Sequence, residues 1–117
     1  MALDDLIILN KLEELDAYSD KKLLQYPKYE RFVLCAEIRK TLLEIMHLTI
    51  RAAKRYYKKT TLQELDIEID YLRRLIRKSK AMQYIDYHTH EVWVEKVDEI
   101  GRMAGGWIIS VQNTTQK

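Results

Sequence analysis

Apolar residues recur at every third or fourth position along most of this chain, a spacing typical of helices packed against one another. The clearest run extends from about Tyr29 to Lys58. Seven positions follow the alternation there: Cys35, Ile38, Leu42, Ile45, Thr49, Ala52 and Tyr56. Three Gly and one Pro leave few places where a helix would break. The pattern therefore predicts an all-α protein.

Four helices are predicted, over about residues 4–24, 29–58, 61–80 and 87–112. The first has Ile8, Leu12 and Leu15 on one face and stops before Tyr26-Pro27. Short connections favour antiparallel neighbours, so the expected architecture is an up-down four-helix bundle. A chain of 117 residues, 47% of them hydrophobic, suffices for one compact core, and residues 1–117 are expected to form one domain.

Two helix starts have local signals. Thr61 followed by Glu64 predicts a capping box for the third helix. Asp86 is the predicted N-cap of the fourth. The expected buried stripes are Leu65, Ile69, Leu72 and Ile76 in the third helix, and Trp93, Val97, Ile100, Ala104, Trp107 (or Ile108) and Val111 in the fourth.

Two helices carry more apolar surface than a bundle core uses. A second stripe runs beside the core stripe of the second helix, and residues 103–109 of the fourth contain no charge. Exposed bands of this kind indicate an interface. The predicted oligomer-interface residues are Leu43, Met46, Ile50, Met103, Gly105, Gly106 and Trp107. Paired glycines let another helix approach closely, although close packing inside one subunit is an equal alternative.

Enzymatic and metal chemistry find little support in the sequence. Glu44 to His47 is the single Glu-x-x-His motif, whereas a ferritin-like di-iron site needs two. His88 and His90 point about 200° apart on a helix. Cys35 and His47 would lie about 18 Å apart along one helix, too far for a nucleophile and its base. We expect no catalytic residues, no metal and no cofactor.

The sequence also lacks the marks of a membrane or exported protein. Charge interrupts every apolar stretch before bilayer-spanning length, and residues 1–14 have no basic signal-peptide region. The lone Cys35, expected to be a buried small hydrophobe, fits a reducing compartment. We therefore expect a cytoplasmic protein.

Positive charge is concentrated in the middle of the chain. Residues 28–59 hold nine Lys or Arg against three Asp or Glu. The predicted nucleic-acid-binding residues form two tracts, Arg51, Lys54, Arg55, Lys58 and Lys59, and then Arg73, Arg74, Arg77 and Lys78, with Lys80 following. Tyr56 and Tyr57 lie in the first tract, and tyrosines stack on unpaired bases. The alternative is ordinary helix-end charge, including an Asp70–Arg74 pair.

Three segments resemble a known family. They are YPKYERFVLCAEI, LQELDIEIDYLRRLIRKSK and EIGRMAGGWIIS, within residues 26–110. The chain resembles the Avd-type accessory proteins of diversity-generating retroelements and the related ribosomal-RNA intervening-sequence proteins. Arg73, Arg74 and Arg77 match a basic family surface. Arg31 and Arg102 also match, with a structural role as the alternative.

The resemblance implies a four-helix bundle that assembles into a ring-like homopentamer. It implies binding to RNA or DNA and to a partner reverse transcriptase, in support of mutagenic copying of template RNA, without catalytic activity. Two alternatives remain open. One is an intervening-sequence type scaffold with weak or no RNA binding, and the other is a purely structural oligomerisation module.

Overall fold

The computed structural model describes residues 6–115, and within them the chain forms four α-helices and no strand. The helices are α1 (Ile7–Leu23), α2 (Leu34–Lys54), α3 (Lys59–Ala81) and α4 (Tyr87–Thr115). A short 3-10 helix, η2 (Lys28–Glu30), lies between α1 and α2. None of these helices has the length and hydropathy that crossing a bilayer requires.

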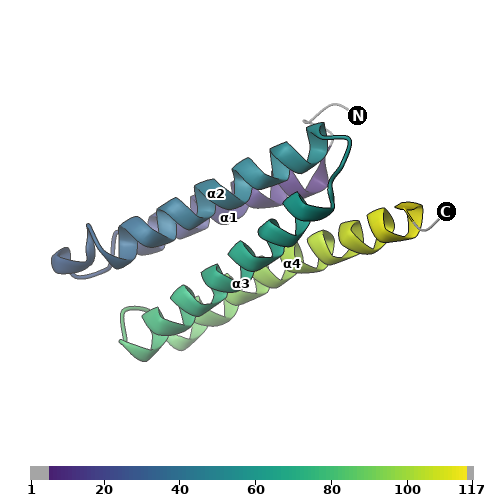
Figure 1. Cartoon of the computed structure of the whole chain (residues 1–117). Coiled ribbons are helices and arrows are strands. Elements are labelled where there is room, and N and C mark those ends of the chain that lie inside the picture. The colour runs from purple at the N-terminus through teal and green to yellow at the C-terminus, as the bar shows by residue number, and fades with distance from the viewer. Residues whose placement is uncertain (1–5, 116–117) are drawn as a thin grey trace.

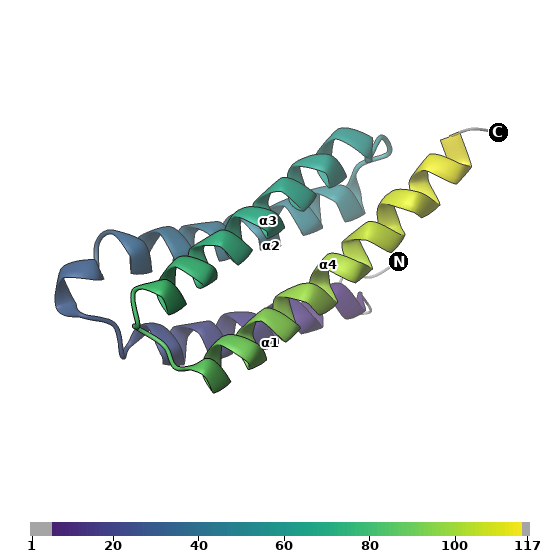
Figure 2. The ribbon, with the colours of Figure 1, turned by 90° about the horizontal axis from the view of Figure 1, so that it is seen from below.

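The helices form an antiparallel bundle with dimensions of 51 × 21 × 21 Å (Figure 1). Each helix packs against the next one in the chain, and α1 also packs against α4. Consequently α2 and α4 occupy opposite corners of the bundle. Figure 2 shows that the last turns of α4 project beyond the ends of the other helices. The prediction of an all-α four-helix bundle is confirmed.

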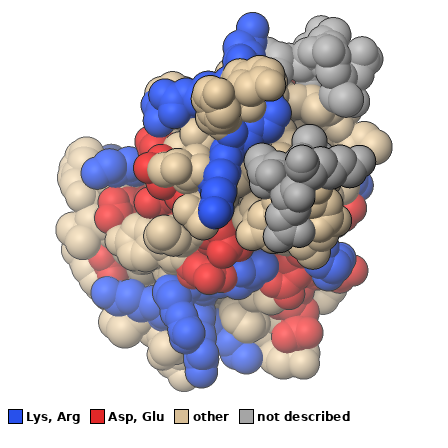
Figure 3. All heavy atoms as spheres, turned by 45° about the vertical axis from the view of Figure 1, so that its right-hand side comes forward, with Lys and Arg blue, Asp and Glu red and all other residues tan. Residues whose placement is uncertain are grey.

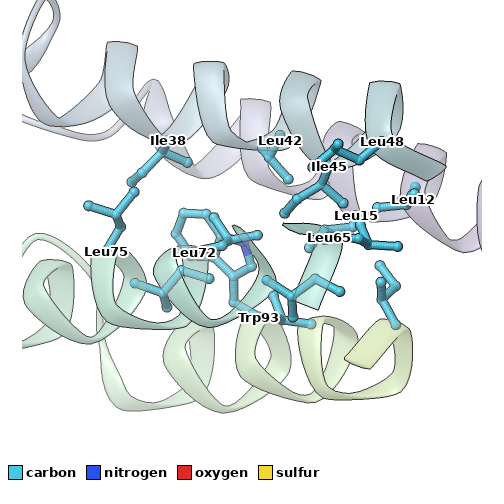
Figure 4. Close-up of a cluster of buried hydrophobic side chains, with 14 of the residues drawn as sticks. Leu12, Leu15, Ile38, Leu42, Ile45, Leu48, Leu65, Leu72, Leu75 and Trp93 are labelled. Carbon is cyan, nitrogen blue, oxygen red and sulfur yellow. The ribbon is translucent and has the colours of Figure 1, made fainter. Parts of the chain in front are cut away.

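Apolar side chains from all four helices meet along the bundle axis (Figure 4). The stripes predicted in α1 and α3 are buried, as are Trp93, Val97, Ile100 and Ala104 of α4. Burying a Leu or Ile side chain stabilises the fold by roughly 1.5–3 kcal/mol, so these stripes hold the helices together. Trp107, Ile108 and Val111 are only partly buried, because α4 leaves the bundle there.

Trp93 is the largest fully buried side chain, and its indole N–H is satisfied. Nε1 donates to Ser19 Oγ at 2.9 Å, and Ser19 Oγ donates to the carbonyl of Leu15 at 2.7 Å. A buried Trp needs such a partner, because an unpaired polar group in the core costs about 1–3 kcal/mol. This chain of bonds fixes α1 against α4.

The second helix is shorter than predicted at both ends. It begins at Leu34 because η2 and a turn occupy the residues after Pro27. It ends at Lys54, and Arg55 is extended. Lys58 Nζ donates to the carbonyls of Ala52, Ala53 and Arg55 at 2.6, 3.3 and 2.6 Å. These bonds satisfy the free carbonyls at the end of α2 and turn the chain toward α3.

Two further predictions about this region are wrong. Tyr56 is not part of the core stripe, because it lies beyond the end of α2 and is exposed. Thr61 does not cap α3, which begins at Lys59 and has no side-chain cap bond. Thr61 is instead buried in the first turn, where its hydroxyl accepts a hydrogen bond from Arg55 Nη1 at 3.2 Å.

The α3–α4 connection is defined by backbone bonds at both sides. Tyr84 N donates to Ser79 O and Gln83 N to Lys80 O, the Schellman pattern, with Gln83 in the left-handed region at φ 63°. Asp86 then caps α4 as predicted, because Thr89 N donates to its Oδ1 at 2.7 Å. That backbone bond lowers the pKa of Asp86 from its ordinary value.

Candidate nucleic-acid interface

The connection between α2 and α3 carries a dense group of cations. We name it the connection patch, and it comprises Arg51, Lys54, Arg55, Lys58 and Lys59. Figure 3 shows blue side chains at the top of the molecule, over this connection. The sequence has no Asp or Glu between Glu44 and Glu64. Among the described residues, no carboxylate forms an ion pair with the patch. Its positive potential is therefore not neutralised locally.

The five cations of the connection patch differ in how far they are already engaged. The Lys58 ammonium is directed at the α2 carbonyls, so it is a structural group first. Arg55 bonds Thr61, and Arg51 Nη2 lies 3.4 Å from His47 Nε2. Lys54 and Lys59 are exposed and make no side-chain hydrogen bond or ion pair within the described part of the chain. Lys54 and Lys59 are thus uncommitted, whereas Arg51 and Arg55 each contact one side chain that is not a carboxylate.

Two tyrosines project from the same connection. Tyr56 is 89% exposed and Tyr57 is 85% exposed. Their ring centroids are 4.9 Å apart and the ring planes meet at 83°, an edge-to-face arrangement. We name them the tyrosine pair. The connection therefore presents aromatic surface directly beside unneutralised positive charge.

The second basic group lies on the later turns of α3. The α3 cluster comprises Arg73, Arg74, Arg77 and Lys78. Arg73 forms ion pairs with Asp70 and with Asp98, where its Nε lies 2.9 Å from Oδ1. The predicted Asp70–Arg74 pair is therefore wrong. Arg74, Arg77 and Lys78 are exposed, and no carboxylate of residues 6–115 pairs with them. Three members of the α3 cluster remain directed to solvent.

Gly101 explains how Arg73 reaches α4. A Cβ built on Gly101 would overlap Arg73 Nη2, so the absence of a side chain makes room for the guanidinium. Arg73 can then lie against α4 and bind Asp98, one turn earlier on that helix. Gly101, the glycine of the EIGRM segment, thus leaves the space in which the ion pair between Arg73 of α3 and Asp98 of α4 forms.

Acidic side chains separate the two basic groups. Glu37, Glu44 and Glu68 line a groove between α2 and α3, with Lys40 as the cation among them. Burial raises the pKa of Glu68, and the neighbouring Glu44 and Glu37 raise it further. Tyr71 donates to Glu37 Oε2 at 2.7 Å, which raises the pKa of Tyr71. A phosphate would be repelled here, so the two basic groups form distinct surfaces.

A shallow groove of about 530 Å³ runs between α3 and α4. Arg73, Arg77 and Lys80 line it from α3, and His90 and Val94 line it from α4. Lys80 Nζ lies 4.9 Å from the centroid of the Tyr87 ring, a cation–π contact. The α3 cluster therefore continues into a concave basic surface.

The predicted oligomer-interface residues fall into three groups. Leu43 is exposed, whereas Met46, Ile50, Met103 and Trp107 pack partly against the core of their own chain. Gly105 and Gly106 have no described atom within 4 Å of the position that a Cβ would take. Close packing inside one subunit is therefore excluded for the glycine pair within the described residues. The α2 and α4 bands lie on helices at opposite corners and do not form one patch.

Two exposed apolar residues, Phe32 and Val33, are not among the predicted site residues, and the sequence leaves the roles of Arg31 and Arg102 open between a basic surface and a structural role. Phe32 and Val33 are exposed, because they lie in the turn before α2 and not on its core face. They line a groove with Ala36 and Leu75. Arg31 and Arg102 are exposed, and neither forms an ion pair with a described residue.

Within residues 6–115, no three His, Cys, Asp or Glu side chains come together as a metal-ligand set. Cys35 is buried as predicted, with Sγ 3.9 Å from the carbonyl of Leu23. Burial raises the pKa of the Cys35 thiol. A buried thiol of raised pKa is a packing group rather than a nucleophile.

The described structure is thus a small all-α bundle whose main surface feature is two groups of outward cations. The family model described as bAvd-like matches residues 6–111, and the chain belongs to this family of bacterial accessory variability determinant proteins. It is a family of accessory proteins and not a known class of enzyme. Comparison with curated proteins gives no match. The resemblance predicted from the sequence is confirmed.

Proposed function

We propose that this protein is a non-enzymatic accessory protein that binds nucleic acid for the reverse transcriptase of a diversity-generating retroelement. One observation carries the proposal: the outward cations of the connection patch and the α3 cluster have no carboxylate partner among the described residues. Lys and Arg in such positions bind phosphates and release condensed counterions. Family membership supports the accessory role.

The two basic groups suit an extended ligand. Lys59 and Arg77 are 18 positions apart on α3, or about 27 Å at 1.5 Å per residue. The acidic α2–α3 groove lies between them, so one strand would contact each group separately. We propose that template RNA, and DNA copied from it, occupies these surfaces while the reverse transcriptase binds the same assembly.

We further propose that the protein acts as a homo-oligomer. The family resemblance implies that this oligomer is a ring-like pentamer. The open space at Gly105 and Gly106 supports a helix–helix contact with another copy. Exposed Leu43, and exposed Phe32 and Val33, supply further apolar surface for such contacts. Each added copy would repeat both basic groups, so a long RNA would bind at several points with increased avidity.

A salt titration tests nucleic-acid binding. Fluorescence anisotropy with a labelled RNA would be measured at several salt concentrations. If all four cations of the connection patch other than Lys58 contact phosphates, the slope of log K against log salt should be about −3 for a single strand from that patch alone. Binding that stays undetectable at low salt would contradict the proposal and favour a scaffold of the intervening-sequence type or a purely structural oligomerisation module.

Charge reversal locates the binding surface. The variant Arg74→Glu, Arg77→Glu and Lys78→Glu should weaken binding by roughly 10-fold or more and reduce the salt slope. Arg73 is left intact because its ion pair with Asp98 connects α3 with α4. Lys21→Glu on exposed α1 surface is the matched control and should change affinity little. Co-purification of the reverse transcriptase with each variant tests whether the polymerase uses the same face.

A further inference from the structure

We propose that the tyrosine pair is a stacking site for unpaired bases, so that the connection patch binds single-stranded nucleic acid in preference to duplex. This inference rests on the proposed nucleic-acid binding and adds the class of ligand. Tyr56 and Tyr57 supply aromatic surface at the point where the chain also concentrates positive charge. Those are the two elements of a single-strand binding surface.

The tyrosine pair differs from every other tyrosine of the chain. All eight tyrosines lie in the described residues, and six have a partner outside the connection. Tyr18 bonds the carbonyl of Thr89, Tyr29 and Tyr84 bond each other, Tyr71 bonds Glu37, Tyr26 packs against Tyr84, and Tyr87 lies under Lys80. Among residues 6–115, Tyr56 and Tyr57 contact only each other by ring contact or hydrogen bond. Their exposed apolar rings are unexplained by the fold.

The ring geometry leaves stacking faces open. In an edge-to-face pair, one ring contributes its edge and keeps both faces free, while the other has one face covered. The planes of Tyr56 and Tyr57 meet at 83° and both rings are almost fully exposed. Flat bases therefore have access to the ring faces. Base–aromatic stacking depends little on sequence, because every base has a π-face.

The connection is also held in place before any ligand binds. Lys58 Nζ bonds three carbonyls at the end of α2, and Arg55 bonds Thr61 at the start of α3. These contacts fix the chain on both sides of the tyrosine pair. A binding surface that is already ordered loses less conformational entropy when its ligand arrives.

The surrounding charge favours a polyanion over a protein partner. Five cations and no carboxylate lie between Glu44 and Glu64. Lys54 and Lys59 flank the tyrosine pair and are free to contact phosphates on either side. A duplex offers phosphates but keeps its bases stacked inside, whereas an unpaired strand offers both.

The test compares four proteins against three probes by fluorescence anisotropy. The probes are a labelled single strand of about 20 nucleotides, its duplex, and an abasic strand of equal length. The proteins are the wild type, the double variant Tyr56→Leu/Tyr57→Leu, the double variant Tyr56→Phe/Tyr57→Phe, and the control Tyr29→Leu, another exposed tyrosine, which lies in η2. Circular dichroism should show equal melting temperatures for the wild type and both Tyr56/Tyr57 double variants, because the pair is outside the core.

We expect the variant Tyr56→Leu/Tyr57→Leu to weaken single-strand binding by roughly 10-fold or more. Duplex and abasic binding should change less than about two-fold, since the cations are intact. Tyr56→Phe/Tyr57→Phe should bind like the wild type, because it keeps both rings. Tyr29→Leu should also bind like the wild type, because η2 contributes no residue to either basic group.

Several results would overturn the inference. One is that Tyr56→Leu/Tyr57→Leu lowers the affinity for single strand and for duplex equally. Another is that it changes neither affinity. Loss of reverse transcriptase capture with unchanged single-strand affinity would make the pair a protein contact instead. A wild type that binds none of the probes at low salt would refute the proposed function as well, whereas the other outcomes leave phosphate binding intact.

Discussion

The guanidinium of Arg73 lies against the backbone of Gly101, and from there it reaches the carboxylate of Asp98. This contact joins α3 to α4 through a charged side chain within a cluster that otherwise faces solvent. Arg73 therefore differs from Arg74 and Arg77, although the three are alike in sequence. Its removal would alter packing as well as charge.

A double-mutant cycle on Gly101 and Arg73 measures this dependence. In an Arg73→Ala background, Gly101→Ala should stabilise α4 by about 0.5–1 kcal/mol through helix propensity. In the wild type, the added methyl displaces the guanidinium, so most of that gain should disappear. Urea unfolding of the four proteins gives the coupling. Equal effects of Gly101→Ala in both backgrounds would show that Arg73 does not need the glycine.

The glycine pair gives a prediction about assembly. A Cβ at position 106 would have no described atom of another turn or helix within 4 Å, so in Gly106→Leu the helical circular dichroism signal should be unchanged. In the oligomer, the larger side chain should force neighbouring helices apart. Sedimentation velocity should then detect a smaller particle than the wild type forms. A particle of unchanged size would mean that Gly106 lies outside the interface.

Lys58 should matter more for stability than its neighbour Lys59. Lys58→Met removes three bonds to the carbonyls at the end of α2, and because the side chain is partly exposed we expect a loss of about 1–2 kcal/mol. Lys59→Met removes an exposed charge that has no partner among the described residues, and its effect should stay within about 0.5 kcal/mol. Urea unfolding compares the pair, and equal losses would contradict the capping role.

Asp86 should contribute to stability in a pH-dependent way. Its pKa is lowered below the ordinary 3.8 by the bond from Thr89 N. The contribution of the ionised group is therefore present above the unfolded-state pKa and is lost as pH falls through the lower folded-state value. The difference in melting temperature between wild type and Asp86→Ala should be largest above about pH 5 and shrink below about pH 4.

The matched control for this pH dependence is Asp86→Asn. Asn keeps a side-chain oxygen at the N-cap but does not titrate. The difference in melting temperature between Asp86→Asn and Asp86→Ala should therefore not change over this pH range. A wild-type advantage over Asp86→Ala that stays constant from pH 7 to pH 3 would show that ionisation of Asp86 does not contribute.

The buried stripes were predictable because the cause is local. A helix repeats every 3.6 residues, so the positions of Leu65, Ile69 and Leu72 identify their own face. Asp86 was predictable for the same reason, since an N-cap bonds an amide three residues away. Membership of the bAvd-like family was also evident from sequence motifs.

The ends of α2 and the bonding of Arg73 were not predictable in this way. The periodicity runs on to Tyr56, but the bonds of Lys58 end the helix earlier, and no pattern distinguishes that lysine from Lys59. From the sequence, Asp70 and Arg74 are expected to form an ion pair because they lie four positions apart on one helix. The partner Asp98 of Arg73 lies 25 residues away and becomes visible only when α3 and α4 are packed together.

Cys35, the chain's one cysteine, is 3% exposed, and its raised pKa leaves little thiolate at neutral pH. A cysteine introduced at exposed Thr60 would therefore take a maleimide dye while the native thiol remains unmodified. Each subunit would then carry one fluorophore. Counting photobleaching steps in single particles would read the number of copies directly, with no need to remove Cys35 first.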